Sequence, residues 1–189
     1  MSNKKSKETE EKTISARVEI YEWIQSIIIA VIICVVIFTF FVRLIDVNGP
    51  SMNPTLEHGD KMVVSNLFYE PKAGDIVIFR KDEYKPEALV KRVIATEGQT
   101  VEIDPNKGVV KVDGVVLDEP YIAAPTSTML DFSGKMTVPE GCVFVMGDNR
   151  NNSTDSRKAE IGMVDERCII GKVYFVIFPL DRIGSPYGD

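Results

Sequence analysis

Hydrophobic and polar positions divide the chain into one long apolar run and a series of short, alternating segments. Between Glu22 and Arg43 lie twenty residues without a charge, residues 23–42, rich in Ile, Val and Phe. At about 1.5 Å per residue, a helix of this length spans roughly 30 Å, the thickness of a bilayer core. Tyr21 and Trp23 suit the membrane interface. The pattern therefore predicts one transmembrane helix at residues 23–42.

The charges around this span predict its orientation. Five basic residues precede it, whereas only Arg43 and Lys61 follow within a similar distance. Because cytoplasmic flanks carry the excess of Lys and Arg, we expect a cytoplasmic tail at residues 1–22 and an extracytoplasmic domain at residues 43–189. The protein is then a single-pass protein of the cell (plasma) membrane.

The region before the span and its two ends carry further expectations. Residues 1–13 are polar without apolar periodicity, so a disordered tail is predicted, followed by a helix that ends near residues 43–46. A cleavable signal peptide is the competing interpretation, but its apolar core would be shorter. Pro50 would also obstruct cleavage after the small residues 47–49. We therefore expect a retained signal anchor.

Beyond the span, short apolar segments separated by turn residues indicate strands. The hairpin signal Asp113-Gly114 is the strongest of the turns, since both central positions need positive φ. We expect one short helix near residues 162–166. The predicted fold is mainly β, with an antiparallel, partly barrel-like β domain after one transmembrane helix. The predicted strands are residues 61–65, 74–79, 89–95, 100–103, 109–112, 115–117, 142–146 and 168–178.

Composition excludes some classes of function. Residues 43–189 carry 17 basic and 23 acidic groups, so the whole net charge of −6 belongs to this region. This acidity argues against a nucleic-acid partner. Cys34, Cys142 and Cys168 lack metal-ligand spacing, and we expect neither a metal nor a cofactor. Cys142 and Cys168 lie in apolar strand-like segments and are interpreted as unpaired, although a disulfide between them is an open alternative.

Ser51 lies in a segment that cannot form a regular helix. The sequence Gly-Pro-Ser-Met-Asn-Pro-Thr-Leu at residues 49–56 has two prolines and a glycine, so it predicts a fixed, irregular loop. Serine between glycine and proline is most often part of a turn. A serine held rigidly close to a membrane span is also a candidate nucleophile, provided that a base lies nearby.

Two residues are candidates for that base. His58 is the single histidine, in a turn seven residues after Ser51, where a solvated role is the simpler interpretation. Lys91 shares one face of its predicted strand with Leu89 and Val93, so of the adjacent cations Lys91 and Arg92 it is the one placed among apolar neighbours. Burial lowers the pKa of a lysine towards a usable base. An edge-strand lysine whose tip reaches water is the alternative.

A third candidate region follows the predicted strand at residues 142–146. Residues 147–157 contain hardly an apolar side chain, which fits either a flexible surface loop or a fixed polar network. Asp148, Asn149, Ser153, Asp155 and Arg157 have the donors and acceptors for such a network, and Asp155 and Arg157 could pair at i, i+2. Composition alone does not decide between the two.

Taken together, these segments resemble the boxes of bacterial type I signal peptidases (leader peptidases), in order and spacing. The similarity covers about residues 20–180, and Glu119-Pro120-Tyr121 also fits it. The single span is more similar to the Gram-positive branch. The segments that carry the resemblance are residues 49–56, 74–79, 89–94 and 146–157.

The resemblance implies a membrane-bound serine endopeptidase that removes N-terminal signal peptides from exported preproteins after small residues of the Ala-X-Ala type. It implies that Ser51 is the nucleophile and Lys91 the general base of a Ser-Lys dyad. In the last box it implies that Ser153 hydrogen-bonds the lysine, and that Asp155 and Arg157 shape the site. The residues that it implies for substrate binding are Val47, Met52, Leu56 and Val90.

One position departs from the family pattern. Some members carry a serine two positions before the nucleophile, whose hydroxyl completes the oxyanion hole, whereas this chain has Gly49. The hole would then rest on the Ser51 backbone N–H and another backbone or water donor. Loss of one oxyanion donor costs on the order of 3 to 4 kcal/mol in other enzymes, so a replacement is expected.

Two other functions remain open at this stage. A Ser-Lys peptidase of the repressor-autocleavage type shares the dyad, but the membrane span argues against it. A catalytically silent, membrane-anchored β-rich binding domain belongs to a different class. Ser51 lies nine residues past Val42, so an extended chain keeps it within about 30 Å of the end of the span. The expected partners are preproteins and the lipid bilayer.

Overall fold

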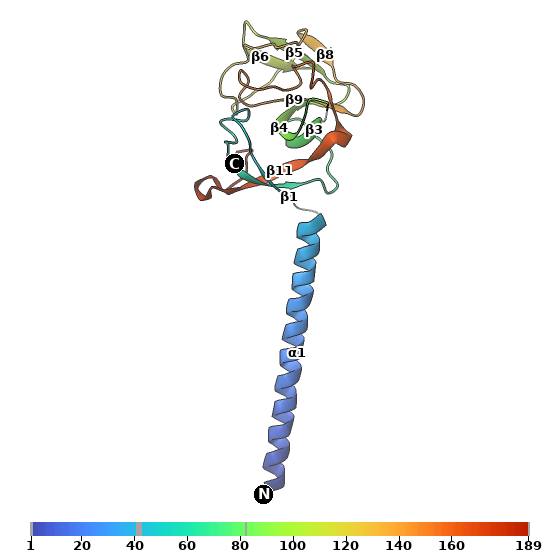
Figure 1. Ribbon diagram of the computed structural model, residues 1–189, viewed down its shortest axis with the longest axis vertical. Helices are drawn as coiled ribbons and strands as arrows, with labels where there is room; N and C mark the ends of the chain where they lie inside the picture. Colours follow the sequence, from blue (N-terminus) through green and yellow to red (C-terminus); the bar gives the residue numbers. More distant parts are fainter. Residues whose placement is uncertain (1, 41–42, 82, 189) are drawn as a thin grey trace. The chain divides into compact units, whose positions relative to one another are not determined.

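The computed structural model describes residues 2–40, 43–81 and 83–188 and divides into two units, Met1–Val42 and Arg43–Asp189. The first unit is a single helix, α1, at Ser2–Phe40 (Figure 1). Its segment Val18–Val36 is long and apolar enough to cross a membrane, by length and composition, with a mean hydropathy of 1.9. This segment overlaps the predicted span but begins earlier. Phe41 and Val42, the end of the predicted span, lie outside the described residues.

Both ends of α1 differ from the sequence prediction. The helix begins at Ser2 instead of following a disordered tail, because residues 2–13 contain no Gly or Pro and are rich in Lys and Glu, which favour helix. At its other end the helix is described as far as Phe40, and Arg43–Asp46 forms strand β1 rather than the end of the helix.

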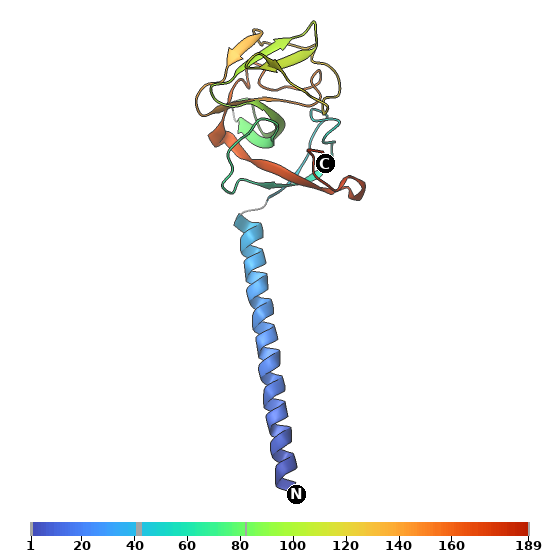
Figure 2. The ribbon, with the colours of Figure 1, turned by 180° about the vertical axis from the view of Figure 1, so that it is seen from behind.

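The second unit consists of two antiparallel sheets, which confirms the predicted fold class. Among the described strands neither sheet closes into a barrel, so the barrel-like feature is limited to curvature and bulges. Figures 1 and 2 show the small sheet at one end of this unit and β11 at the other. The seven-stranded sheet has the order β1 (Arg43–Asp46), β2 (Lys61–Ser65), β11 (Ile169–Phe178), β3 (Ile76–Lys81), β4 (Lys85–Ala95), β9 (Cys142–Met146) and β10 (Val164–Asp165). The four-stranded sheet has the order β7 (Val115–Val116), β6 (Val109–Val112), β5 (Thr100–Asp104) and β8 (Lys135–Thr137).

Most predicted strands are present, with shifted ends. Strands β1, β8 and β10 were not predicted, because each has only two to four residues and carries little alternation. The helix expected near residues 162–166 is wrong: this stretch contains β10 and leads into a 3₁₀ turn, η1, at Glu166–Cys168. A second 3₁₀ turn, η2, lies at Leu180–Arg182. Cys142 and Cys168 are free thiols, in agreement with the unpaired interpretation.

The second half of strand β4, residues 89–95, is buried on both faces, because apolar clusters cover it from either side. Val90 belongs to a cluster with residues of β2, β3 and β11 and of the loop after β1. Leu89 and Val93 belong to another cluster with Phe79 and residues of β9. A third cluster fills the space between the small sheet and β9. Side chains at successive positions of β4 therefore enter different parts of the core. As a result Lys91 and Arg92, which are adjacent in sequence, have different neighbours.

Candidate active site

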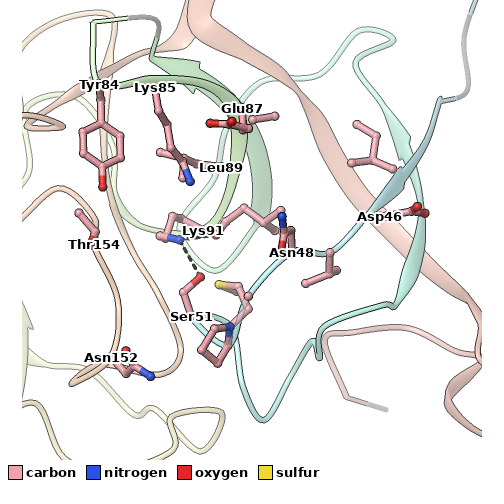
Figure 3. A pocket seen from close by; sticks show the side chains of 17 residues that line it. Asp46, Asn48, Ser51, Tyr84, Lys85, Glu87, Leu89, Lys91, Asn152 and Thr154 are labelled. Carbon is pink, nitrogen blue, oxygen red and sulfur yellow. Dashed lines mark hydrogen bonds between the residues drawn. The ribbon is translucent and has the colours of Figure 1, made fainter.

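A groove of about 460 Å³ lies between the segment at residues 45–52 and the segment at residues 84–91, and Asn152 and Thr154 also line it. Figure 3 shows Lys91 reaching from β4 to Ser51, with Lys85 and Glu87 further along the same strand. The groove thus brings together three parts of the chain that are far apart in sequence.

The loop that carries Ser51 is fixed, as predicted, and a distant segment fixes it. The Ser51 carbonyl accepts the Asn149 backbone N–H at 3.1 Å. The Pro50 carbonyl accepts the Asn53 N–H at 3.1 Å and the Asn149 side-chain amide at 3.2 Å. Gly49 has a φ of 98°, a conformation that a residue with a Cβ rarely adopts. The serine hydroxyl is therefore presented from a defined backbone.

Lys91 meets this serine directly. Its Nζ donates to Ser51 Oγ at 2.8 Å and to the Val90 carbonyl at 2.9 Å. Only 2% of the residue is exposed, and among the described residues no carboxylate forms an ion pair with it. The alternative of an edge lysine with its tip in water is therefore wrong.

The surroundings of Lys91 favour its neutral form. Burial lowers the pKa of Lys91 to about 8, because a charged ammonium is poorly solvated there. Neighbouring charges contribute to the same value: those of Asp155 and Asp148 raise the pKa of Lys91, whereas those of Lys85 and Arg157 lower it. The net result is an amine that can exchange a proton near neutral pH.

The neighbouring cation, Arg92, is equally buried, which the sequence pattern did not predict. Its exposed fraction is 3%, because both faces of β4 are covered. Unlike Lys91, it forms a two-pronged ion pair with Asp148, at 2.8 Å from Nε and 2.6 Å from Nη2. The guanidinium lies 4.0 Å from the centre of the Tyr121 ring, and Thr55 donates to the same carboxylate. Asp148 thus joins β4 to the loop of Ser51.

Residues 147–157 form a fixed polar network rather than a flexible loop. Arg157 pairs with Asp155 through Nε at 2.8 Å and Nη2 at 2.9 Å, the i, i+2 pair that the sequence suggested. Arg157 also donates to the carbonyls of Thr128 and Arg150, and Asp155 accepts the Gly147 N–H at 3.0 Å. Both side chains are fully buried. Sequence composition left this outcome open because it does not reveal burial.

Ser153 differs from what the family resemblance implied. No hydrogen bond joins it to Lys91; among the described residues its buried Oγ has no partner. A Cβ built on Gly147 would overlap both Ser153 Oγ and the Ser51 carbonyl. Glycine is therefore required here, because it lets the Ser51 loop approach the network closely.

The residues predicted for substrate binding lie together in one apolar cluster. Val47, Met52, Leu56 and Val90 are all buried. The groove is lined by Val47, Met52 and Val90, whereas Leu56 packs within the cluster and is not among the lining residues. Three of the four predicted side chains therefore border the groove that contains Ser51.

Gly49 and His58 meet each other rather than the serine. The Gly49 N–H faces His58 Nδ1 at 3.4 Å, and the histidine is exposed. His58 is thus not placed as the base for Ser51. Gly49 itself lines the groove.

Sequence reasoning missed the partners of two buried arginines. Arg150 forms an ion pair with Glu119 and also donates to Thr126 Oγ1 at 3.1 Å. Glu119 and Tyr121, which packs on Arg92, belong to the Glu-Pro-Tyr segment that resembled the family. The resemblance of this segment to the family was a signal that it is important. The amino-acid sequence does not, however, indicate that Glu119 pairs with Arg150 and that Tyr121 packs on Arg92.

Comparisons with known proteins bear on this site. A sequence model of the family described as signal peptidase, peptidase S26, matches residues 20–178. Signal peptidase I of Bacillus licheniformis is 38% identical over 186 residues, covering 93% of this chain and 97% of that protein. A probable signal peptidase I-1 of Synechocystis is 39% identical and covers 88% and 86%, respectively.

One solved structure, a signal peptidase I from Enterococcus faecalis V583, is 30% identical. The match covers 55% of this chain and 97% of the chain in the solved structure, with a TM-score of 0.47. The family match extends over most of the chain, and the relatives match at almost full length. The chain therefore belongs to the S26 family of signal peptidases and is a serine peptidase.

Proposed function

We propose that this peptidase uses a Ser51–Lys91 dyad to cleave signal peptides from exported preproteins after small residues of the Ala-X-Ala type. One observation carries the proposal: Lys91 Nζ lies 2.8 Å from Ser51 Oγ while the lysine is buried without a carboxylate partner among the described residues. A nucleophile and a base within hydrogen-bond distance are the geometry that covalent catalysis requires.

The lowered pKa supports the role of Lys91 as a base. With a pKa of about 8, about one lysine in ten is neutral at pH 7, compared with about one in 3,000 at the ordinary value of 10.5. Neutral Lys91 takes the Ser51 proton as Oγ attacks the scissile carbonyl, and an acyl-enzyme forms. The protonated Lys91 gives this proton to the amine of the leaving mature protein. Neutral again, Lys91 then activates the water that hydrolyses the acyl-enzyme and releases the signal peptide.

Two strand edges next to the groove support binding of an extended substrate. Strand β4 pairs with β3 from Lys85 onwards, but its pairing with β9 begins only at Arg92. Among the strands that the structure describes, β1 pairs only with β2. An extended preprotein segment can therefore add to these edges through its backbone, with its side chains next to Val47, Met52 and Val90, which line the groove.

Gly49 limits the oxyanion hole in this proposal. The Ser51 N–H is one donor, since no hydrogen bond described for the chain uses it. The hydroxyl that a serine would contribute at position 49 is missing. The second donor is then a backbone N–H or a water, as expected from the sequence.

Several features support a retained membrane anchor with the catalytic unit outside the cytoplasm. The segment Val18–Val36 meets the length and composition of a span, and the basic residues lie before it. The catalytic unit also exposes apolar side chains: Leu44 and Phe175 are both register partners of Val63, and Phe178 is half exposed. A protease added outside intact cells should therefore digest the catalytic unit.

Substitution of the dyad tests the proposal. Ser51→Ala and Lys91→Ala should each abolish cleavage of an Ala-X-Ala preprotein by the full-length protein in detergent, with unchanged circular dichroism. N-terminal sequencing of the wild-type product locates the cut. Appreciable residual cleavage by either variant would contradict the dyad.

Labelling of Ser51 separates the enzyme from the alternative of a silent binding domain. A penem, which acylates activated serines, should modify Ser51 in the wild-type protein and leave Lys91→Ala unmodified. Mass spectrometry of the intact protein and its peptides gives the result. A wild-type protein that stays unlabelled and uncleaving would favour the binding domain.

A further inference from the structure

The turn after the last strand reaches back to the loop of the nucleophile. Arg182 is the last residue of η2, which follows β11. Its guanidinium donates to Asp60 Oδ1 at 3.2 Å and Oδ2 at 3.1 Å, to Glu57 Oε1 at 2.8 Å and to the Thr55 carbonyl at 3.2 Å. Figures 1 and 2 both show the C-terminal end of the chain close to the loop that follows β1. The Arg182 side chain thus links residues 55, 57 and 60 through hydrogen bonds.

Asp60 extends this contact towards the groove. It is 1% exposed, and its carboxylate also accepts the Glu57 N–H at 2.9 Å. Its carbonyl accepts the N–H of Val47, which lines the groove, at 2.8 Å. Arg182 therefore closes the base of the loop that begins at Val47, carries Ser51 and ends at Asp60.

The loop of Ser51 is consequently held from two directions. Asp148 and Asn149 hold it from the network of residues 147–157, through Thr55 Oγ1 and the Ser51 carbonyl. Arg182 holds its other side through the Thr55 carbonyl and Asp60. The family model matches residues 20–178, so Arg182 lies beyond the matched region.

We propose that Arg182 is a positioning residue for Ser51, keeping the serine hydroxyl at hydrogen-bond distance from Lys91. The proposal rests on the dyad. Four hydrogen bonds from one planar group to a carbonyl and two carboxylates fix a loop more strictly than a single charge can. Misplacement of reacting atoms by about 1 Å can slow a reaction about 100-fold.

Three variants of the full-length protein in detergent test the proposal. Arg182→Met removes all four bonds. Arg182→Lys keeps the charge next to Asp60, but one ammonium does not reproduce the fork. Arg167→Met is the matched control: Arg167 pairs with Asp165 through a similar fork, at 2.9 Å from Nε to Oδ1, with no described contact to the loop of Ser51.

The rate of Ser51 acylation by a penem and the kcat and KM for a preprotein peptide are measured well below the melting temperature of every variant. We expect Arg182→Met to lower the acylation rate and kcat at least about tenfold, with KM nearly unchanged because the strand edges are intact. Arg182→Lys should fold with a melting temperature close to that of the wild type and still lose several-fold in kcat. Arg167→Met should match the wild type.

Two outcomes would overturn the proposal. One is wild-type acylation and kcat in Arg182→Lys and Arg182→Met, which would leave Arg182 a purely structural residue. The other is an equal loss of kcat in Arg167→Met, which would reflect general destabilisation. Failure of the dyad is distinguishable from both, because then the wild-type protein itself would not be acylated at Ser51.

The pH profile gives an additional readout. The midpoint of kcat/KM should be the same in Arg182→Lys and the wild type, since Arg182 contacts neither Lys91 nor its charged neighbours Lys85, Asp148, Asp155 and Arg157. A shifted midpoint would contradict a role limited to positioning the serine.

Discussion

Lys91 and Arg92 are adjacent cations on one strand and are buried to the same degree. Their side chains point to opposite faces of β4, where they meet different hydrogen-bond partners. Lys91 meets a hydroxyl and a carbonyl, at 2.8 and 2.9 Å. Arg92 meets the Asp148 carboxylate with two hydrogen bonds, the Gly74 carbonyl and the Tyr121 ring. Burial is shared, so the difference lies in the counter-charge.

The two environments have opposite effects on the two cations. Burial lowers the pKa of Lys91 to about 8. Burial by itself also lowers the pKa of Arg92, but the hydrogen bonds and charge of Asp148 outweigh it and hold this pKa above its ordinary value. The surroundings of Lys91 therefore favour release of its proton, whereas the surroundings of Arg92 keep the guanidinium charged. A buried cation without a carboxylate partner is a candidate for a catalytic role, whereas a buried cation paired with a carboxylate is typical of a structural role.

Replacement of Lys91 by Met should have the largest effect on activity and the opposite effect on stability. Methionine fills a similar volume without a charge, so cleavage should fall at least about 1,000-fold while the protein becomes more stable. The difference between a pKa of 10.5 and about 8, at about 1.4 kcal/mol per pH unit, predicts a gain of about 3 kcal/mol at pH 7. Denaturant unfolding of both proteins measures it.

The gain in unfolding free energy of Lys91→Met over the wild type should depend on pH between about pH 8 and 10.5. In the unfolded chain Lys91 keeps its proton up to pH 10.5, whereas in the folded chain it loses the proton near pH 8. Between these values the unfolded state binds more protons, so the wild-type protein gains stability as pH rises and approaches Lys91→Met. A stability difference that stayed constant from pH 7 to 10.5 would contradict the buried, unpaired lysine.

Removal of the counter-charge from the other face should instead destabilise the protein. Asp148→Ala leaves Arg92 buried and unpaired, which should cost about 3 to 5 kcal/mol in unfolding free energy. The matched control is Asp165→Ala, because the partner of Asp165 is 90% exposed and such a pair contributes at most about 1 kcal/mol. Equal losses in the two variants would show that burial does not distinguish the pairs.

The pH dependence of cleavage tests the Lys91 face alone. Because neutral Lys91 is the active form, kcat/KM should rise with pH and reach half its maximum at about pH 8. Stopped assays with one preprotein peptide between pH 6 and 9.5 measure the midpoint. A flat profile down to pH 6 would exclude Lys91 as the titrating base.

The smallest expected effect comes from Lys85, which lines the same groove. Its positive charge lowers the pKa of Lys91, so Lys85→Met should move the midpoint of kcat/KM to higher pH by a few tenths of a unit. Lys107→Met controls for the change in net charge, since Lys107 is exposed in the turn between β5 and β6 of the small sheet. A shift towards lower pH would have the wrong sign for a cation near Lys91.

The sequence by itself determined the outline of the protein. The uncharged run before Arg43 indicated a span, and alternation with the Asp113-Gly114 turn indicated antiparallel strands, because both patterns reflect local geometry. Residues 49–56 indicated a fixed loop because proline and glycine restrict the backbone locally. Family resemblance then identified Ser51 and Lys91, whose mutual distance no periodicity reveals.

Only the tertiary structure decided which polar groups meet. Burial on both faces of β4 depends on loops and strands distant in sequence. The pairing of Arg92 with Asp148, and the absence of an ion pair at Lys91 within the described part of the chain, were therefore not readable from the strand itself. The same reason explains why Ser153 does not bond Lys91 and why Arg182 reaches residues 55–60. Local pattern specifies which face a side chain occupies, whereas its partner depends on contacts between segments that lie 40 to 127 residues apart in the chain.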